Sequence, residues 1–234
     1  MNCCSCKKYE DKDTTIPVVI PRETRLKDNY IAAIFCNTYD NKSYTLHEGP
    51  LNDAIETSKQ LIKYGYKPFI FHDLRSKDFV SILISFLSNE ANSLVIYFTG
   101  HGAQVKDRNH DEKDGYDEAF VLVDGYVVDD TIKQIIDQHN NAKKLILISD
   151  CCHSGTIFDI PADSNILTIS AARDEECATQ TIMPNKRNCG TFTYYFWKYM
   201  EMSRDSKVIA PLINAKLQKY KHSCVFNHDC EEIL

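Results

Sequence analysis

Two apolar runs in the sequence end next to residues that could perform nucleophilic catalysis. His101 follows the run SLVIYFT (93–99), and Cys152 lies just beyond the run KKLILIS (143–149). A cysteine attacks as its thiolate, so it needs a histidine or another basic partner close by. A single histidine after a strand is more often structural than catalytic. The second run, which leads to a cysteine, favours a catalytic pair at the ends of two strands.

A carboxylate and two backbone amides would complete such a site. Asp150 lies two residues before Cys152, so in an extended strand both side chains point to one face. An aspartate that ends a buried strand is costly unless it is paired, and the guanidinium of an Arg substrate side chain would pair with it most strongly. The amides of Gly102 and Cys152 could together bind an oxyanion. The pattern therefore predicts a nucleophile beside an acidic pocket.

The elements that must position these residues alternate along the chain. Strands are expected at 29–35, 67–71, 93–99, 143–149 and 165–170, and helices at 49–66, 76–89, the later part of 127–139, 191–200 and 210–220. Apolar strands that alternate with helices indicate an α/β fold, with a mostly parallel sheet covered on both faces. In such sheets functional groups lie beyond the carboxyl ends of the strands. A short hairpin is expected around 120–128.

Composition limits the classes of protein to which the chain can belong. Its 234 residues are 43% apolar and 26% charged, as in globular domains, and the net charge of −6 argues against nucleic-acid binding. One domain is expected over 29–234, after a flexible tail at 1–28. The longest apolar run, 79–87, is too short to span a membrane. With no secretion signal evident, the ten cysteines are expected to be reduced thiols in a monomeric protein of the cytoplasm, or alternatively of the nucleus.

The segments around the two candidate residues resemble a known family. VIYFTGHGAQ (95–104) and LILISDCCHSGT (145–156) are similar to the histidine and cysteine motifs of caspase-fold cysteine peptidases, with the histidine first. The Asp-Cys-Cys-His-Ser-Gly version resembles the metacaspases, especially their type I-like single-chain members. The similarity runs from about residue 29 to about residue 220. It is supported by three further stretches, GYDEAF (115–120), VVDD (127–130) and ISAARDEE (169–176).

The resemblance implies a fold and a chemistry. The fold would be a caspase-like three-layer αβα sandwich with a mostly parallel central sheet. Cys152 aligns with the nucleophile because it directly precedes His-Ser-Gly, and His101 aligns with the catalytic histidine. The substrates would be proteins or peptides with Arg or Lys at P1, the residue before the cleaved bond. The S1 pocket, which binds P1, would comprise Asp53, Thr99, Asp150 and Ser170. Asp53 could equally be a solvated acid in the first turn of a helix.

Calcium is the cofactor that the resemblance implies. Nine acids fall between residues 107 and 130, and so many carboxylates are either solvated or hold a hard cation. The EF-hand pattern fails, because Glu112 stands where a loop begun at Asp107 needs glycine. The resemblance implies that an activating Ca²⁺ binds to four aspartates, Asp117, Asp129, Asp130 and Asp159. A solvated run of charge remains the alternative.

Several other readings stay open at this point. The chain could be a pseudo-peptidase that serves as a calcium-responsive interaction module, although an intact Cys152 and His101 argue against that. It could also be a peptidase activated by dimerisation. Zinc binding is not favoured by the spacing of Cys3, Cys4 and Cys6, or of His222, Cys224, His228 and Cys230. The basic residues at which the chain could process itself are Arg22, Arg25, Lys27, Lys186 and Arg187.

Overall fold

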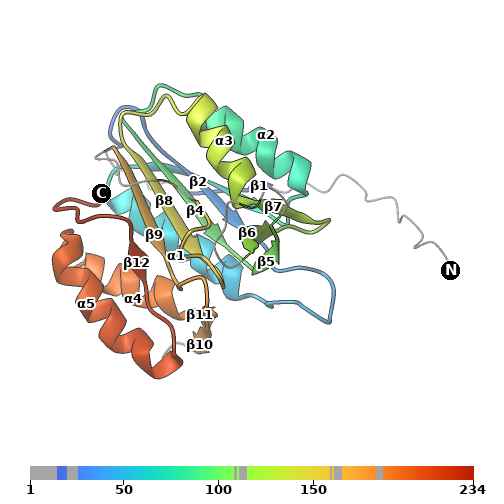
Figure 1. Cartoon of the computed structure of the whole chain (residues 1–234). Coiled ribbons are helices and arrows are strands. Elements are labelled where there is room, and N and C mark those ends of the chain that lie inside the picture. Colours follow the sequence, from blue (N-terminus) through green and yellow to red (C-terminus); the bar gives the residue numbers. More distant parts are fainter. Residues whose placement is uncertain are drawn as a thin grey trace, which may run out of the picture.

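A seven-stranded sheet forms the centre of the molecule. The computed structural model describes residues 15–19, 26–107, 110, 115–158, 160, 165–182 and 187–234. The strand order is β1-β3-β2-β4-β8-β9-β12 (Figure 1), and the five inner strands are parallel while both edge strands are antiparallel. The bounds are β1 (Thr15–Ile16), β2 (Tyr30–Cys36), β3 (Lys67–His72), β4 (Ser93–Thr99), β8 (Leu145–Asp150), β9 (Ile166–Ser170) and β12 (Val225–Phe226). The mostly parallel sheet is confirmed.

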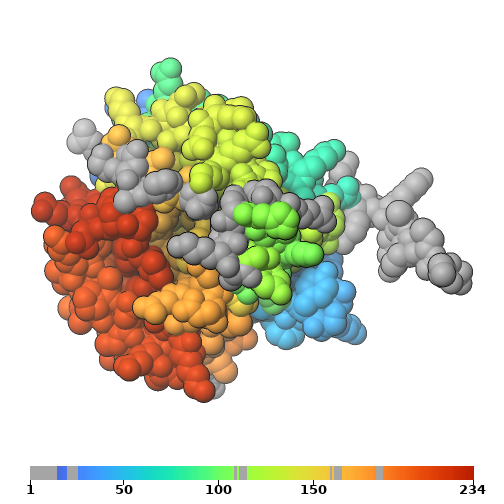
Figure 2. Space-filling model, viewed as in Figure 1, coloured from blue at the N-terminus to red at the C-terminus, as the bar shows by residue number. Residues whose placement is uncertain are grey.

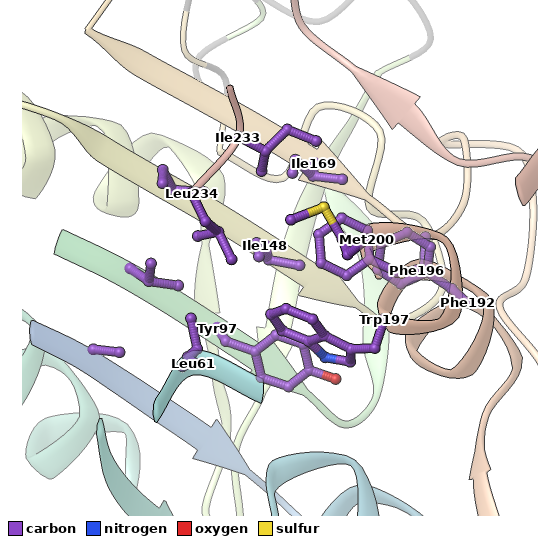
Figure 3. Packing of buried hydrophobic residues seen from close by; sticks show 14 of the residues in the cluster. Leu61, Tyr97, Ile148, Ile169, Phe192, Phe196, Trp197, Met200, Ile233 and Leu234 are labelled. Carbon is purple, nitrogen blue, oxygen red and sulfur yellow. The ribbon is translucent and has the colours of Figure 1, made fainter. Parts of the chain in front are cut away.

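Helices cover both faces of this sheet. On one face lie α1 (Gly49–Lys63), α4 (Thr191–Met200) and α5 (Ser206–Leu217), the last followed by a short 3-10 helix at Gln218–Tyr220. On the other face α2 (Ser76–Leu87) and α3 (Asp129–His139) lie side by side, as Figure 1 shows. Each face has its own buried apolar cluster, and Figure 3 shows Phe192, Phe196 and Trp197 of α4 packed over Tyr97 and Ile148. The three-layer αβα architecture is therefore confirmed.

Two smaller sheets extend from the ends of the central strands. One has the order β5-β6-β7, from β5 (Gly102–Lys106), β6 (Tyr116–Val121) and β7 (Tyr126–Val128), and the other is the hairpin of β10 (Gln180–Ile182) and β11 (Asn188–Gly190). The hairpin predicted around 120–128 is that of β6 and β7. The strands β5, β10, β11 and β12 were not predicted, because they are short and mix polar with apolar residues.

Two residues of the segment 1–28, for which a flexible tail is predicted, belong to the central sheet. Thr15 and Ile16 form β1, which pairs antiparallel with Phe71 and Ile70 of β3. The strand covers an edge of the central sheet that would otherwise leave backbone groups without partners. Lys27 also reaches the domain, since its amide donates to the Gly65 carbonyl at 2.8 Å. The boundary between residues 28 and 29 stays a prediction.

One helix begins earlier than the sequence pattern predicts. The apolar spacing indicated a helix over 210–220, whereas α5 starts at Ser206. The Asp205 side chain accepts a hydrogen bond from the Lys207 amide at 2.8 Å and so caps the first turn. None of the helices in the described part of the chain has the length and apolarity needed to cross a membrane.

Candidate active site

The two candidate catalytic residues emerge from neighbouring parallel strands at the same edge of the sheet. Thr99 of β4 pairs with Asp150 of β8, so His101 and Cys152 each stand two residues beyond a matched pair. The chain segments touch here, because a Cβ atom at Gly102 would overlap the carbonyl oxygen of Cys152. Only glycine allows this approach, and it brings the two strand ends together as the sequence predicts.

Cys151 and Cys152 have different surroundings. The Cys151 side chain is buried in the apolar cluster under α2 and α3, and this burial holds the pKa of its thiol well above the ordinary value. Cys152 is partly exposed, and its thiol donates to the Ala178 carbonyl at 3.7 Å. Burial, together with the neighbouring Cys177 thiol, raises the pKa of Cys152 to about 12. The resting Cys152 is therefore a neutral thiol that needs a base.

His101 is oriented by the connection between β2 and α1. Its Nε2 lies 2.6 Å from the carbonyl oxygen of Tyr44. A carbonyl only accepts hydrogen bonds, so Nε2 carries the proton and Nδ1 is the nitrogen that can accept one. The ring of Tyr39 packs against the imidazole, with ring centroids 4.9 Å apart. In Figure 2 the blue residues of this connection lie on the surface beside the green residues of the β5-β6-β7 sheet.

The two amides predicted to bind an oxyanion are not used by the neighbouring strands. The Val121 amide donates to the His101 carbonyl at 3.1 Å, which makes Gly102 and Phe120 a non-hydrogen-bonded pair. The Gly102 amide therefore points away from β6. For the Cys152 amide, the described residues provide no acceptor. Both N–H groups are thus available to a ligand.

The two aspartates predicted to bind P1 are both buried. Asp53 of α1 is 2% exposed, and both of its oxygens accept from the Gly190 amide at 2.9 Å. Asp150 is 5% exposed, and its Oδ2 accepts from the amide of Thr193 at 3.2 Å and from the hydroxyl of Thr193 at 2.6 Å. Burial raises the pKa of both acids, and the charge of Asp150 raises that of Asp53 further. Within the described residues no Lys or Arg pairs with either acid.

The other two predicted S1 residues differ in where they lie. The Thr99 hydroxyl donates to Oδ2 of Asp53 at 3.3 Å, so Thr99 belongs to the carboxylate pair. Ser170 stands at the end of β9, and its hydroxyl accepts from that of Ser149 at 3.2 Å. The structure therefore brings Asp53, Thr99 and Asp150 together, and it bonds Ser170 to the adjacent strand instead.

A cavity of about 390 Å³ lies between α1 and α4. Asp53 and Thr193 are in its wall, whereas His101 and Cys152 are not. The other lining residues include charged side chains of both signs, namely Glu56, Lys59, Arg187, Lys198 and Glu201. The cavity therefore reaches Asp53 from the side of the helices, whereas Asp150 is not in its wall.

Three of the four proposed calcium ligands come from neighbouring elements. Asp117 lies on β6, and Asp129 and Asp130 open α3. Asp129 is 3% exposed, and its oxygens accept from the amides of Glu118 at 3.1 Å and Asp130 at 2.8 Å. Its pKa is raised to about 7, chiefly by burial and in addition by the carboxylates of Glu118 and Asp117. This crowding of buried carboxylates is compatible with a cation-binding site.

The structure does not by itself define a metal centre. Asp159 lies outside the described residues, and among those described no three His, Cys, Asp or Glu side chains have the arrangement of a metal site. The acidic group, which comprises Asp117, Glu118, Asp129 and Asp130, is nevertheless hydrogen-bonded to the loop that follows Cys152. Glu118 accepts from the Thr156 hydroxyl at 2.8 Å and from the Gln104 amide at 3.0 Å. Thr156 stands four residues beyond Cys152.

The cysteines and histidines near the two ends of the chain differ in what the structure describes of them. Cys3, Cys4 and Cys6 lie outside the described residues. His222 is 1% exposed, and its imidazole bonds to the Ala171 carbonyl at 2.8 Å and the Thr179 hydroxyl at 3.1 Å. Its two nitrogens are therefore used in packing the segment after α5 against β9.

Sequence reasoning missed several residues that build the site. Tyr44 and Ala178 act through their backbone carbonyls, which leave no signal in side-chain type. Tyr39 carries no motif of its own. Gly190 could have been found, because a glycine directly before the helical run TFTYYFW marks a close approach of backbone. Thr193 could then have been found as well, because it lies in the first turn of α4, close to the same carboxylates.

Comparison with known proteins agrees with this geometry. The caspase domain family model, Peptidase_C14, matches residues 29–227. The chain belongs to the caspase-domain family of cysteine peptidases. It is 28% identical over 171 residues to metacaspase-3 of Arabidopsis thaliana, an alignment that covers 59% of this chain and 47% of that protein. It is 33% identical over 138 residues to metacaspase-1 of Cryptococcus neoformans var. neoformans, covering 48% and 30%.

The match to these curated relatives is partial in length. The chain spans about half or less of the length of each relative named. Among solved structures, a protein from Geobacter sulfurreducens has a TM-score of 0.68 at 17% identity, covering 85% of this chain and 92% of that one. Caspase-1 from Spodoptera frugiperda has a TM-score of 0.63 at 14% identity, covering 92% and 94%. These structural likenesses show that the chain has the caspase fold.

Proposed function

We propose that this chain is a cysteine endopeptidase that hydrolyses peptide bonds after Arg or Lys, with Cys152 as nucleophile and His101 as general acid and base. The observation that carries the proposal is the juxtaposition at one sheet edge of two features. One is a thiol and an imidazole at matched positions beyond β4 and β8. The other is a pair of buried carboxylates with no cationic partner in the described part of the chain.

The first half-reaction forms a thioester. The Cys152 thiol gives its proton to Nδ1 of His101, and Sγ attacks the carbonyl carbon of the scissile bond. The negative oxygen of the tetrahedral intermediate is held by the amides of Gly102 and Cys152. His101 then donates its proton to the leaving nitrogen, and the C–N bond breaks. The amine product departs, and the acyl group remains on Cys152.

The second half-reaction returns the free enzyme. Nδ1 of His101 accepts a proton from water, and the hydroxide attacks the thioester carbonyl. Collapse of the intermediate breaks the C–S bond, and the thiolate recovers its proton from His101. The carbonyl of Tyr44 holds Nε2–H throughout, so the imidazolium is stabilised and its orientation is kept.

Specificity follows from the carboxylate pair. Each acid is held by neutral donors, Gly190 and Thr99 at Asp53, and Thr193 at Asp150. Burial without a cation disfavours ionisation of both, which their raised pKa expresses. A guanidinium or ammonium group at P1 would supply the missing charge. The proposed substrates are therefore proteins with Arg or Lys at the cleaved position.

Calcium activation is part of the proposal. Asp117, Asp129 and Asp130 would hold the ion, with Asp159 as a fourth ligand, and carboxylate oxygens are the donors that Ca²⁺ prefers. The bound ion would relieve the repulsion that raises the pKa of Asp129. The route to the nucleophile is the hydrogen bond from Thr156 to Glu118. Self-processing at a basic residue remains an accompanying prediction, and of the candidates only Lys27 and Arg187 lie in the described part of the chain.

The test is a panel of fluorogenic peptides with Arg, Lys, Asp or Leu at P1, assayed with calcium and with chelator. Wild-type protein should cleave the Arg and Lys peptides, and Asp150→Asn should lower kcat/KM for them by about 100-fold or more, because one member of a buried charge pair is lost. Thr168→Val, on β9 away from the pocket, is the matched control and should leave kcat/KM within about twofold. Unchanged cleavage by Asp150→Asn would refute the specificity assignment.

A further inference from the structure

Two tyrosines flank the imidazole of His101 and contact it in different ways. The Tyr39 ring lies 4.9 Å from the imidazole, centroid to centroid, at an interplanar angle of 33°. The Tyr44 ring is more distant, at 6.3 Å and 58°. Tyr44 provides its backbone carbonyl to Nε2, and no hydrogen bond of its hydroxyl occurs among the described residues. Tyr39 uses its hydroxyl.

The Tyr39 hydroxyl joins the backbone of residue 101 to the end of β6. It accepts from the His101 amide at 2.8 Å and donates to the Val121 carbonyl at 2.8 Å. Tyr39 is 3% exposed, and burial raises the pKa of its phenol, which therefore keeps the proton that it donates. The fit is close, because a Cβ atom at Gly100 would stand 2.8 Å from the Tyr39 oxygen.

The backbone that carries Tyr39 is fixed in an unusual conformation. Tyr39 has φ +61°, in the left-handed region that costs a non-glycine residue free energy. Asp73 stabilises this turn, since its Oδ1 accepts from the amides of Thr38 at 2.7 Å and Tyr39 at 3.1 Å. Its Oδ2 accepts from the Thr38 hydroxyl at 3.0 Å. The carboxylate thus aims the phenol at His101.

We propose that Tyr39 is a positioning residue for His101, which rests on the proposed role of His101 as general acid and base. Its hydroxyl fixes the backbone of residue 101, and its ring fixes the plane of the imidazole. Together they keep Nε2–H on the Tyr44 carbonyl and leave Nδ1 as the proton acceptor. Tyr39 does not touch the substrate, so it acts on the rate of proton transfer and leaves substrate binding alone.

Tyr39 and Tyr126 provide a matched pair of variants. Tyr39→Phe removes the hydroxyl that bonds to His101, whereas Tyr126→Phe removes the hydroxyl of a half-exposed tyrosine on β7 that is not part of the site. In the full chain, kcat and KM are measured on a P1 Arg peptide, and thermal unfolding is followed for each protein. Tyr39→Phe should lower kcat by about tenfold or more with KM unchanged, and Tyr126→Phe should stay within about twofold.

A second measurement reads the orientation of the imidazole without turnover. Long-range ¹H–¹⁵N correlation spectra of labelled protein, with His101 assigned by His101→Ala, report which ring nitrogen carries the proton. Wild type and Tyr126→Phe should show the Nε2–H form, and Tyr39→Phe should show a mixture. Gly100→Ala provides a second variant, because its Cβ pushes against the same hydroxyl and should lower kcat in the same way.

The outcomes separate this proposal from the peptidase assignment. Wild-type kcat and an unmixed Nε2–H form in Tyr39→Phe would overturn the role of Tyr39, as would an equal loss in Tyr126→Phe. Wild-type protein without Cys152-dependent cleavage would overturn the peptidase assignment, and the tautomer comparison would still decide whether Tyr39 positions His101. If Tyr39→Phe does not fold, Gly100→Ala decides, and wild-type kcat in that variant would count against the proposal.

Discussion

At the scale of single residues, the protonation state of the Cys152 thiol governs the proposed chemistry. Burial is the largest cause of its raised pKa, and the adjacent Cys177 thiol is the next. Cys177 is exposed and its sulfur lies 3.9 Å from Nε2 of His153, so its removal leaves the buried core untouched. The contribution of Cys177 can therefore be measured separately from that of burial.

We predict that Cys177→Ala lowers the pKa of Cys152 and makes it more reactive. Each unit of pKa changes the thiolate fraction about tenfold at a pH below the pKa, so alkylation by iodoacetamide at pH 8 should accelerate several-fold. The rate is followed by mass spectrometry of the peptide that contains Cys152. Cys230→Ala, which changes a distant thiol, should have no effect. An alkylation rate unchanged by Cys177→Ala would show that the neighbouring thiol does not influence the nucleophile.

The residues of the site divide by how visible they are in sequence. His101, Cys152 and Asp150 carry their chemistry in side-chain type and lie at predictable strand ends. The structure brings them to one edge, as expected. Tyr44 and Ala178 contribute carbonyls, and Ser170 bonds to Ser149 because neighbouring strands place the two hydroxyls side by side. Backbone groups and cross-strand partners depend on the fold, so no local pattern could have identified them.

At the scale of elements, the junction of β11 and α4 fixes the geometry of the carboxylate pair Asp53 and Asp150. Gly190 ends β11, and a Cβ atom there would overlap Oδ2 of Asp150 and lie 3.1 Å from Oδ2 of Asp53. The absent side chain lets the backbone amide reach Asp53, and it places Thr193 on Asp150. The start of α4 is therefore hydrogen-bonded to both carboxylates, to Asp53 through Gly190 and to Asp150 through Thr193.

We expect Gly190→Ala to disrupt this junction. Overpacking against two buried carboxylates should lower the free energy of unfolding by about 1–3 kcal/mol and abolish cleavage of P1 Arg peptides. Urea unfolding and peptide hydrolysis check the two effects. Gly125→Ala is the control, because the nearest atom to its Cβ is the Ser76 hydroxyl oxygen at 3.5 Å, and stability should change by less than about 0.5 kcal/mol. Equal stability of the two variants would contradict the account.

The elements themselves were predictable to different degrees. The apolar run at 93–99 and the helical run at 191–200 became β4 and α4 without change of bounds. The first is a continuous apolar run and the second has apolar residues at helical spacing, and both patterns are local properties of the sequence. Thr15–Ile16 became β1 only because the free edge of β3 was available to pair with it. A two-residue strand has no period, so its formation depends on tertiary context.

At the scale of the whole molecule, the acidic group on β6 and α3 links the stability of the fold to pH and, in the proposed function, to calcium. The pKa of Asp129 is about 7 in the folded protein, against an ordinary value of 3.8. Between these values the folded state holds a proton that the unfolded chain has released. The unfolded state therefore binds fewer protons, and the free energy of unfolding falls as pH rises from about 4 to 7.

We predict that wild-type protein in chelator loses about 1–2 kcal/mol of unfolding free energy between pH 5 and 7.5 through this group. Calcium should restore that stability at pH 7.5 and have little effect at pH 5, where Asp129 is protonated. Asp129→Asn should lose this component of the pH dependence and the calcium response, while Asp137→Asn, at an exposed position of the same helix, should keep both. Chemical unfolding at each pH measures the effect. Identical pH and calcium dependence in wild type and Asp129→Asn would remove Asp129 from the account.

The most direct test of the central assignment is to label the nucleophile. The 234-residue chain is incubated with peptidyl acyloxymethyl ketones that carry Arg or Asp at P1, and the modified residue is mapped by mass spectrometry. The account predicts an adduct on Cys152 alone, formed faster by the Arg probe, retained in Cys151→Ala and absent from Cys152→Ala. An adduct on Cys151, faster reaction with the Asp probe, or equal loss in both variants when both are folded would contradict it.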